Sequence, residues 1–179
     1  MSESARVITV TPAPAIDRTY VLDSFELGEV HRASEVHSEI AGKGVNVSTN
    51  LNVADVASLA VVPLSPEDSA GIESTLLVAH PISQRVRVNI TVLEDGGRTT
   101  KINEKAPALT SSEWASLVDT TLALGRTNEA SWILLAGTMP PCSNAPSLSL
   151  EELFSRAHQD GMLVGLDTSG TPLLNLARS

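Results

Sequence analysis

The sequence predicts an α/β protein in which a mostly parallel β-sheet is flanked by helices. Short runs of β-branched and aliphatic residues stop at proline, glycine or aspartate, as the buried strands of such sheets do. From residue 110 onward these runs alternate with helical patterns, which is the order of β–α–β units. Hydrophobic residues make up 42% of the 179 residues and aromatic residues only 3%, so we expect an aliphatic core.

The first elements are short strands. Residues 6–11 form a β-branched run that ends at Pro12 and Pro14, which is typical of a buried strand. Residues 17–22 predict a second strand. The polar stretch 28–38 predicts an edge strand or part of a lid, because it alternates only weakly.

A helix is expected directly after the glycines at 42 and 44. Val47, Leu51 and Ala54 follow the i, i+4, i+7 spacing and predict its buried face. Residues 59–64 predict another buried strand. Residues 65–84 are polar and interrupted by proline, and we assign no element to them. Residues 85–102 alternate polar and apolar side chains around a turn at 94–97, which predicts a β-hairpin.

Two capping boxes predict helix starts in the second half of the chain. They pair Thr110 with Glu113 and Ser149 with Glu152. Gly161 fits the left-handed position that follows a helix. Residues 131–137 and 162–166 predict strands, whose carboxyl ends form the edge where open α/β sheets bind ligands.

Composition and charge exclude several classes. The net charge of −9 argues against nucleic acid as a partner. No apolar run approaches 18 residues and no signal peptide is evident, so we expect a soluble cytoplasmic protein without a membrane span. The lone Cys142 excludes an internal disulfide framework, and the four dispersed histidines show no metal-ligand spacing.

The segment Gly42-Lys43-Gly44 is the first candidate for ligand binding. It matches neither the phosphate-binding loop pattern nor the dinucleotide fingerprint G-x-G-x-x-G, which excludes a dinucleotide-dependent oxidoreductase. A glycine-lined helix start with a lysine offers free N–H groups to an anion or a sugar hydroxyl. The alternative is a tight turn with a solvated lysine. Asp17 either accepts hydrogen bonds from sugar hydroxyls or stabilises a turn.

The hairpin carries a concentration of positive charge. Five of the 12 basic residues lie within 21 positions, namely Arg85, Arg87, Arg98, Lys101 and Lys105. The window has a charge of +2, while the rest of the chain has −11. This suits a phosphorylated small molecule. The alternative is an edge hairpin that is charged to prevent aggregation.

Five segments, in chain order, resemble the ribokinase-like sugar kinases. The likeness is to their phosphofructokinase B branch and, within it, to the bacterial 1-phosphofructokinases. The segments are TVTPAPAIDRT (9–19), AGKGVNV (41–47), RVNITV with TKINE (87–92 and 100–104), LAGTMPP (135–141) and LDTSG (166–170). The resemblance implies a ribokinase-like fold with a small β-sheet lid, made by segments of about 17–38 and 85–104.

The resemblance also implies an activity and a site. Such enzymes use ATP and Mg²⁺ to phosphorylate a sugar phosphate, here fructose 1-phosphate to fructose 1,6-bisphosphate. Tagatose 6-phosphate and fructose 6-phosphate are the alternative substrates, and the lids of such kinases often form homodimers. The implied substrate-binding residues are Asp17, Gly42, Lys43, Asn46, Arg87, Asn89, Lys101 and Thr138, of which Arg87 and Lys101 are the candidates for gripping the phosphate.

The sequence also departs from the family. Members run to about 300 residues. The sequence contains neither their Asn-x-x-Glu segment nor the glycine-rich segment with the catalytic base. We therefore expect residues 1–179 to be a truncated, partial kinase domain that carries the sugar-binding half and is inactive alone. The alternative is a non-catalytic remnant that acts at most as a sugar-phosphate-binding or lid-mediated interaction module. Ala41, Asp55 and Cys142 stand where the family usually has glycine, and the region between Asn46 and Arg87 is shorter.

Overall fold

The computed structural model describes residues 6–70 and 72–169. It confirms the α/β class with a parallel sheet flanked by helices. Gly170, the last residue of the LDTSG segment, lies outside the described residues. The elements in chain order are β1 (Val7–Val10), β2 (Ala15–Leu22), β3 (Glu35–Ala41), α1 (Lys43–Val53), β4 (Ser58–Leu64), α2 (Pro66–Ser69), β5 (Leu77–Pro81), β6 (Arg87–Glu94), β7 (Thr99–Asn103), α3 (Ser111–Thr127), β8 (Trp132–Ala136), α4 (Glu151–Gln159) and β9 (Leu163–Asp167).

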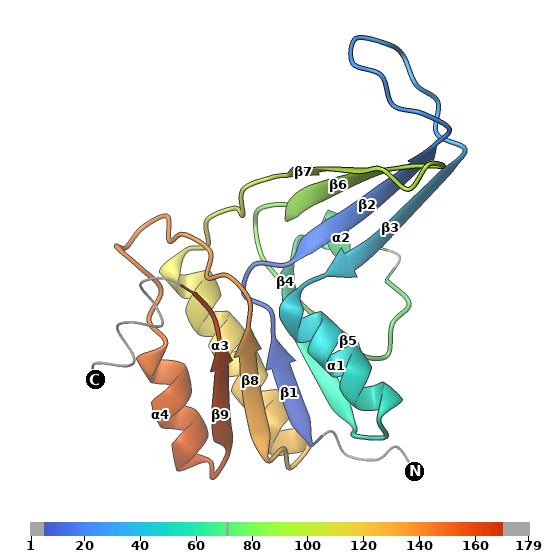
Figure 1. Cartoon of the computed structure of the whole chain (residues 1–179). Coiled ribbons are helices and arrows are strands. Elements are labelled where there is room, and N and C mark those ends of the chain that lie inside the picture. The colour runs from blue at the N-terminus through green and yellow to red at the C-terminus, as the bar shows by residue number, and fades with distance from the viewer. Residues whose placement is uncertain (1–5, 71, 170–179) are drawn as a thin grey trace.

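The main sheet has five strands in the order β5-β4-β1-β8-β9, and every neighbouring pair is parallel. A second sheet of four strands has the order β3-β2-β6-β7. In it β2 pairs antiparallel with β3 and parallel with β6, and β6 pairs antiparallel with β7 in the predicted hairpin. Figure 1 shows this small sheet beyond the carboxyl ends of β1, β8 and β9.

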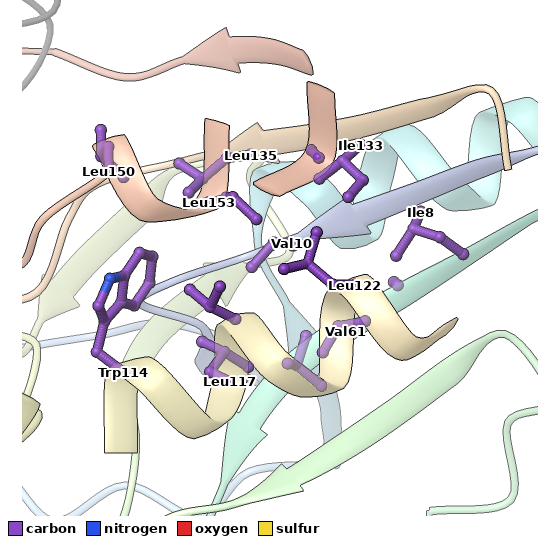
Figure 2. Close-up of a cluster of buried hydrophobic side chains, with 14 of the residues drawn as sticks. Ile8, Val10, Val61, Trp114, Leu117, Leu122, Ile133, Leu135, Leu150 and Leu153 are labelled. Carbon is purple, nitrogen blue, oxygen red and sulfur yellow. The ribbon is translucent and has the colours of Figure 1, made fainter. Parts of the chain in front are cut away.

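Helices cover the two faces of the main sheet unequally. Helix α1 packs against β1 and β4 on one face, while α3 contacts β1 and β8, and α4 contacts β9, on the other (Figure 1). The aliphatic core lies on the α3 side, as Figure 2 shows. Its strand residues Ile8, Val10, Val61, Ile133 and Leu135 are at most 1% exposed. Burying each such side chain contributes roughly 1.5–3 kcal/mol to folding.

The buried face predicted for α1 is wrong. Ala54 is exposed, and the residues that the helix buries are Gly44, Val45 and Ser48. The Ser48 hydroxyl lies 2.7 Å from that of Ser58 at the start of β4. Hydroxyl groups that satisfy one another can be buried without the usual cost, and the small side chains let the helix approach the sheet closely.

The first predicted capping box is confirmed and the second is wrong. Thr110 and Glu113 make both reciprocal hydrogen bonds at the start of α3. Helix α4 begins instead with Leu150 as its N-cap and has no side-chain cap. The Ser149 carbonyl there accepts a 2.7 Å hydrogen bond from the Trp114 indole, which ties α3 to the segment before α4.

Helices α1, α3 and α4 end in the same way. Each has one left-handed residue after its C-cap, with φ of 58° at Asp55, 51° at Glu129 and 78° at Gly161. Two reversed backbone hydrogen bonds close each end, which is the Schellman motif. The substituted glycine position at 55 is therefore a site of backbone strain, whereas Cys142 does not have a positive φ.

Among the described residues, no helix has the length and apolar character needed to cross a membrane. Residues 65–84, to which the sequence assigned no element, contain the short helix α2 and strand β5. Within α2, Asp68 is buried, and it contacts the segment that enters the small sheet.

Candidate functional site

The candidate site lies where the amino end of α1 meets the carboxyl ends of β1 and β9. The Thr11 hydroxyl accepts a 3.1 Å hydrogen bond from the Val45 amide and so caps α1 from the loop after β1. A Cβ added at Gly42 would collide with the Thr11 side chain, and one at Gly44 would lie 3.0 Å from the Val10 carbonyl. The glycines are thus required by close packing.

Lys43 projects from this helix start toward the end of β9. Its ammonium nitrogen lies 3.1 and 3.2 Å from the two carboxylate oxygens of Asp167. Both side chains are more than half exposed, so they remain open to an incoming ligand. The next residue, Thr168, is 9% exposed and its hydroxyl is buried without a partner.

A second group of candidates lies on one face of the small sheet. Asp17 stands opposite Asn89 in the β2–β6 pairing, and the Asn89 amide donates a 2.9 Å hydrogen bond to Asp17. Arg87, two residues earlier on β6, donates to the Ala13 carbonyl at 3.1 Å. Residues two apart on a strand share a face, so Arg87 and Asn89 point the same way.

This face contains unpaired polar atoms. The Arg87 Nε group and the Asn89 Oδ1 atom are both buried and have no hydrogen-bond partner. Buried polar atoms of native proteins are almost always paired, and an orphaned one costs about 1–3 kcal/mol. A donor and an acceptor left open two residues apart fit a polar ligand that carries both an acceptor and a hydroxyl.

Lys101 and Thr138 lie farther from these contacts. Lys101 is exposed on β7 opposite Thr91, and so it shares the face of Asn89. Thr138 is exposed after β8, where Gly137 has a φ of 126°. Among the described residues, neither side chain makes a hydrogen bond or ion pair with another candidate. The structure therefore brings together Asp17 with Asn89, and separately Lys43 with Asp167.

Asn46 lines a cavity of about 420 Å³ between α1, β3 and β5. Glu39 lines the same cavity, and it is the register partner of Asp17 on β3. The small sheet and α1 thus contribute polar groups to one region of the molecule. The remaining lining residues are mostly small or aliphatic.

Two hairpin arginines that the charge pattern singled out have structural partners. Arg85 bonds to the Asp68 carboxylate at 2.8 and 2.9 Å. Arg98 bonds to Glu94 at 2.6 and 2.7 Å, and these bonds hold the pKa of Glu94 below its ordinary value. Arg87 and Lys101 are the hairpin cations that stay available on the candidate face.

Asp68 is a structural support that the sequence analysis missed, and Glu113 makes contacts beyond its predicted capping box. Burial alone would raise the pKa of Asp68, but hydrogen bonds from the Val86 amide, Arg85 and Ser65 outweigh it and lower that pKa. Glu113 accepts from the amides of Thr110 and Ser83 at 2.8 Å. A signal was present for Asp68, because Ser65 followed by proline and two acids is typical of a helix start.

The described residues do not build a metal site on their own. Within residues 6–70 and 72–169, no three histidine, cysteine or acidic side chains converge as metal ligands would. The carboxylate at the site, Asp167, is engaged by Lys43.

The parallel sheet flanked by helices, with a small sheet beyond its strand ends, agrees with the ribokinase-like fold that the sequence resemblance implies. No family model matches the chain. It is 33% identical over 96% of its length to a 1-phosphofructokinase of Xanthomonas campestris, and 28% identical over 95% to one of Haloferax volcanii. Each match covers 55% of the relative, so the chain spans about half the length of the curated relatives it matches.

A solved structure agrees with these relatives. Escherichia coli phosphofructokinase-2, in a tetrameric inhibited form, superposes with a TM-score of 0.77 at 21% identity. That match covers 94% of this chain and 56% of the other. The two curated relatives confirm the predicted resemblance to 1-phosphofructokinases, and the solved structure confirms the similarity of fold.

Proposed function

We propose that the chain binds a sugar phosphate, fructose 1-phosphate, as the substrate-binding half of an ATP-dependent sugar-phosphate kinase. The observation that carries the proposal is the pair of buried, unpaired atoms on the small sheet, Arg87 Nε and Asn89 Oδ1, beside the Asp17 carboxylate. These groups supply the donor and acceptors that a phosphorylated sugar needs.

Each group has a role that its chemistry suggests. The Asp17 carboxylate accepts hydrogen bonds from sugar hydroxyls, and Asn89 Oδ1 accepts another. Arg87 and Lys101 bind the phosphate through charge-assisted hydrogen bonds, which are about twice as strong as neutral ones. Lys43, Gly42 and Asn46 line the helix start, and Thr138 borders the substrate from the end of β8.

In the complete reaction, ATP donates its γ-phosphoryl group to a hydroxyl of the sugar phosphate and yields the bisphosphate. The Mg²⁺ that such kinases use would supply positive charge to the transferred group, and the described residues of this chain form no site for it by themselves. The residues of this chain would orient the acceptor, because phosphoryl transfer depends mainly on positioning and electrostatic stabilisation. We infer that residues 1–179 bind the sugar phosphate without transferring phosphate, as a non-catalytic binding module would.

The test compares ligands by calorimetry. Fructose 1-phosphate is titrated into the chain alongside fructose, fructose 6-phosphate and tagatose 6-phosphate, and ADP release is followed with ATP and Mg²⁺ added. We expect binding of fructose 1-phosphate and none of fructose, without ADP release. Absence of binding at millimolar fructose 1-phosphate would exclude the substrate role, and ADP release would show that the chain is catalytic.

We further propose that two chains associate through the small sheet. Its other face carries Val36 and Ile102 on the edge strands β3 and β7, and they are 53% and 56% exposed. The register places both on the face opposite Asp17 and Asn89. Sedimentation of the chain and of Val36→Asp tests this, and a concentration-independent monomer would contradict it.

A further inference from the structure

The main sheet has an apolar surface that the described helices cover only in part. Residues on alternate positions of β1 and β4 face α1, and Thr9 donates a 2.8 Å hydrogen bond to the Gly44 carbonyl there. The register extends the same face across β8 and β9 through the pairs Trp132 with Leu163 and Leu134 with Gly165. We call these four residues the β8–β9 face.

The β8–β9 face exposes large apolar side chains that are usually buried. Trp132 is 44% and Leu163 52% exposed, whereas Ile133 and Leu135 on the opposite face are fully buried. Figure 1 shows α1 lying over β1 and β4. It also contacts β8, and Leu134 and Gly165 are half-buried, so the exposed part of the face is at Trp132 and Leu163, where the two strands begin. Parallel sheets are normally covered on both faces, so the exposed start of these two strands can accept a covering layer.

Strand β9 adds an open edge to this face. It pairs with β8 on one side and is the last strand of the five-stranded sheet. Its unpaired side carries main-chain donors and acceptors that can receive a further strand. The bare face and the open edge are continuous, which distinguishes them from scattered exposed side chains.

The comparisons indicate what such a layer would be. Both curated relatives match nearly all of this chain with only 55% of their own length, which leaves about 45% of each relative without a counterpart here. We propose that the β8–β9 face and the β9 edge form the docking surface for a polypeptide equivalent to that remaining part. The partner would bring an apolar helix face against Trp132 and Leu163. This proposal does not depend on the sugar ligand.

The experiment co-expresses this chain with a differently tagged polypeptide, the part of the Xanthomonas campestris 1-phosphofructokinase that lies outside the match. We expect the two to purify together in a one-to-one complex. We also expect Trp132 fluorescence to shift to shorter wavelength, since Trp132 is exposed while Trp114 is only 4% exposed. The shift should vanish in Trp132→Phe.

Two further variants locate the surface. Leu163→Glu places a charge at the exposed start of β9, beside Trp132 on the β8–β9 face, and should weaken the complex at least tenfold. Val53→Glu makes the same kind of change at a 79% exposed position on α1 and should leave it intact. Circular dichroism verifies that both variants fold. Failure of the folded chains to associate, association that Leu163→Glu does not weaken, or self-association of this chain that Leu163→Glu abolishes would each overturn the proposal.

Discussion

The Lys43 ammonium bridges both carboxylate oxygens of Asp167, at 3.1 and 3.2 Å, and joins α1 to the end of β9 across 124 positions of sequence. The side chains are 60% and 57% exposed, so the pair is solvated. Such exposed ion pairs contribute about 0–1 kcal/mol to stability. We therefore interpret the contact as a feature of the binding site.

Asp167→Asn tests this interpretation. We expect the free energy of unfolding to change by less than about 0.5 kcal/mol, because the pair is exposed. Affinity for fructose 1-phosphate should rise several-fold, because removal of one negative charge near an anion is worth about 1 kcal/mol in water. Calorimetry and thermal unfolding measure the two effects. Lys43→Ala removes a positive charge instead and should weaken binding. Weaker binding by Asp167→Asn would contradict the account.

The buried Asp68 carboxylate should matter more to stability than its partner Arg85. The Asp68 side chain is fully buried, while that of Arg85 is 69% exposed and can return to water. Asp68→Ala leaves the Val86 amide without its 2.8 Å acceptor, and we expect a loss of about 2–3 kcal/mol. Arg85→Ala should lower the free energy of unfolding in urea by less than Asp68→Ala does. The reverse order would contradict the claim that the buried carboxylate matters more than its exposed partner.

The helix ends predict stabilising substitutions. Asp55 and Glu129 occupy left-handed positions at φ of 58° and 51°, where glycine is unstrained. Asp55→Gly and Glu129→Gly should each stabilise the chain by about 0.5–1 kcal/mol. Gly161→Ala at the equivalent end of α4 should destabilise it by a similar amount. Thermal unfolding of the three variants tests the signs, and a destabilising Asp55→Gly would argue against strain at that position.

The sequence predicted the strands other than β5, and the confirmed capping box, because local residue patterns define them. It could not predict the buried face of α1, since Ser48 is buried only because Ser58 on another strand satisfies its hydroxyl. Residues 65–84 were unassigned for a related reason. Asp68 is held by Arg85 and the Val86 amide, and those contacts exist only once the chain has folded.

Glu113 predicts a specific dependence of stability on pH. Burial opposes its ionisation, but the amide and hydroxyl hydrogen bonds from Thr110 and Ser83 lower its pKa from 4.5 to about 2. A depressed carboxyl pKa stabilises the fold above pH 4.5, and this contribution is lost as the pH falls toward 2. We expect Glu113→Gln to be less stable than the parent near pH 7, with the gap narrowing between pH 4.5 and 2. A gap that is independent of pH would contradict the assignment.

The binding of fructose 1-phosphate to Arg87→Ala, compared with Arg18→Ala, tests the central claim most directly. The two substitutions remove the same charge from the small sheet, but Arg18 points to the opposite face and bonds to Ser38 at 3.1 Å. Calorimetry of the folded variants should show at least a tenfold loss of affinity for Arg87→Ala and almost none for Arg18→Ala, since a charged hydrogen bond is worth about 1.5–3 kcal/mol. Equal affinities of the two variants would contradict the proposed sugar-phosphate site.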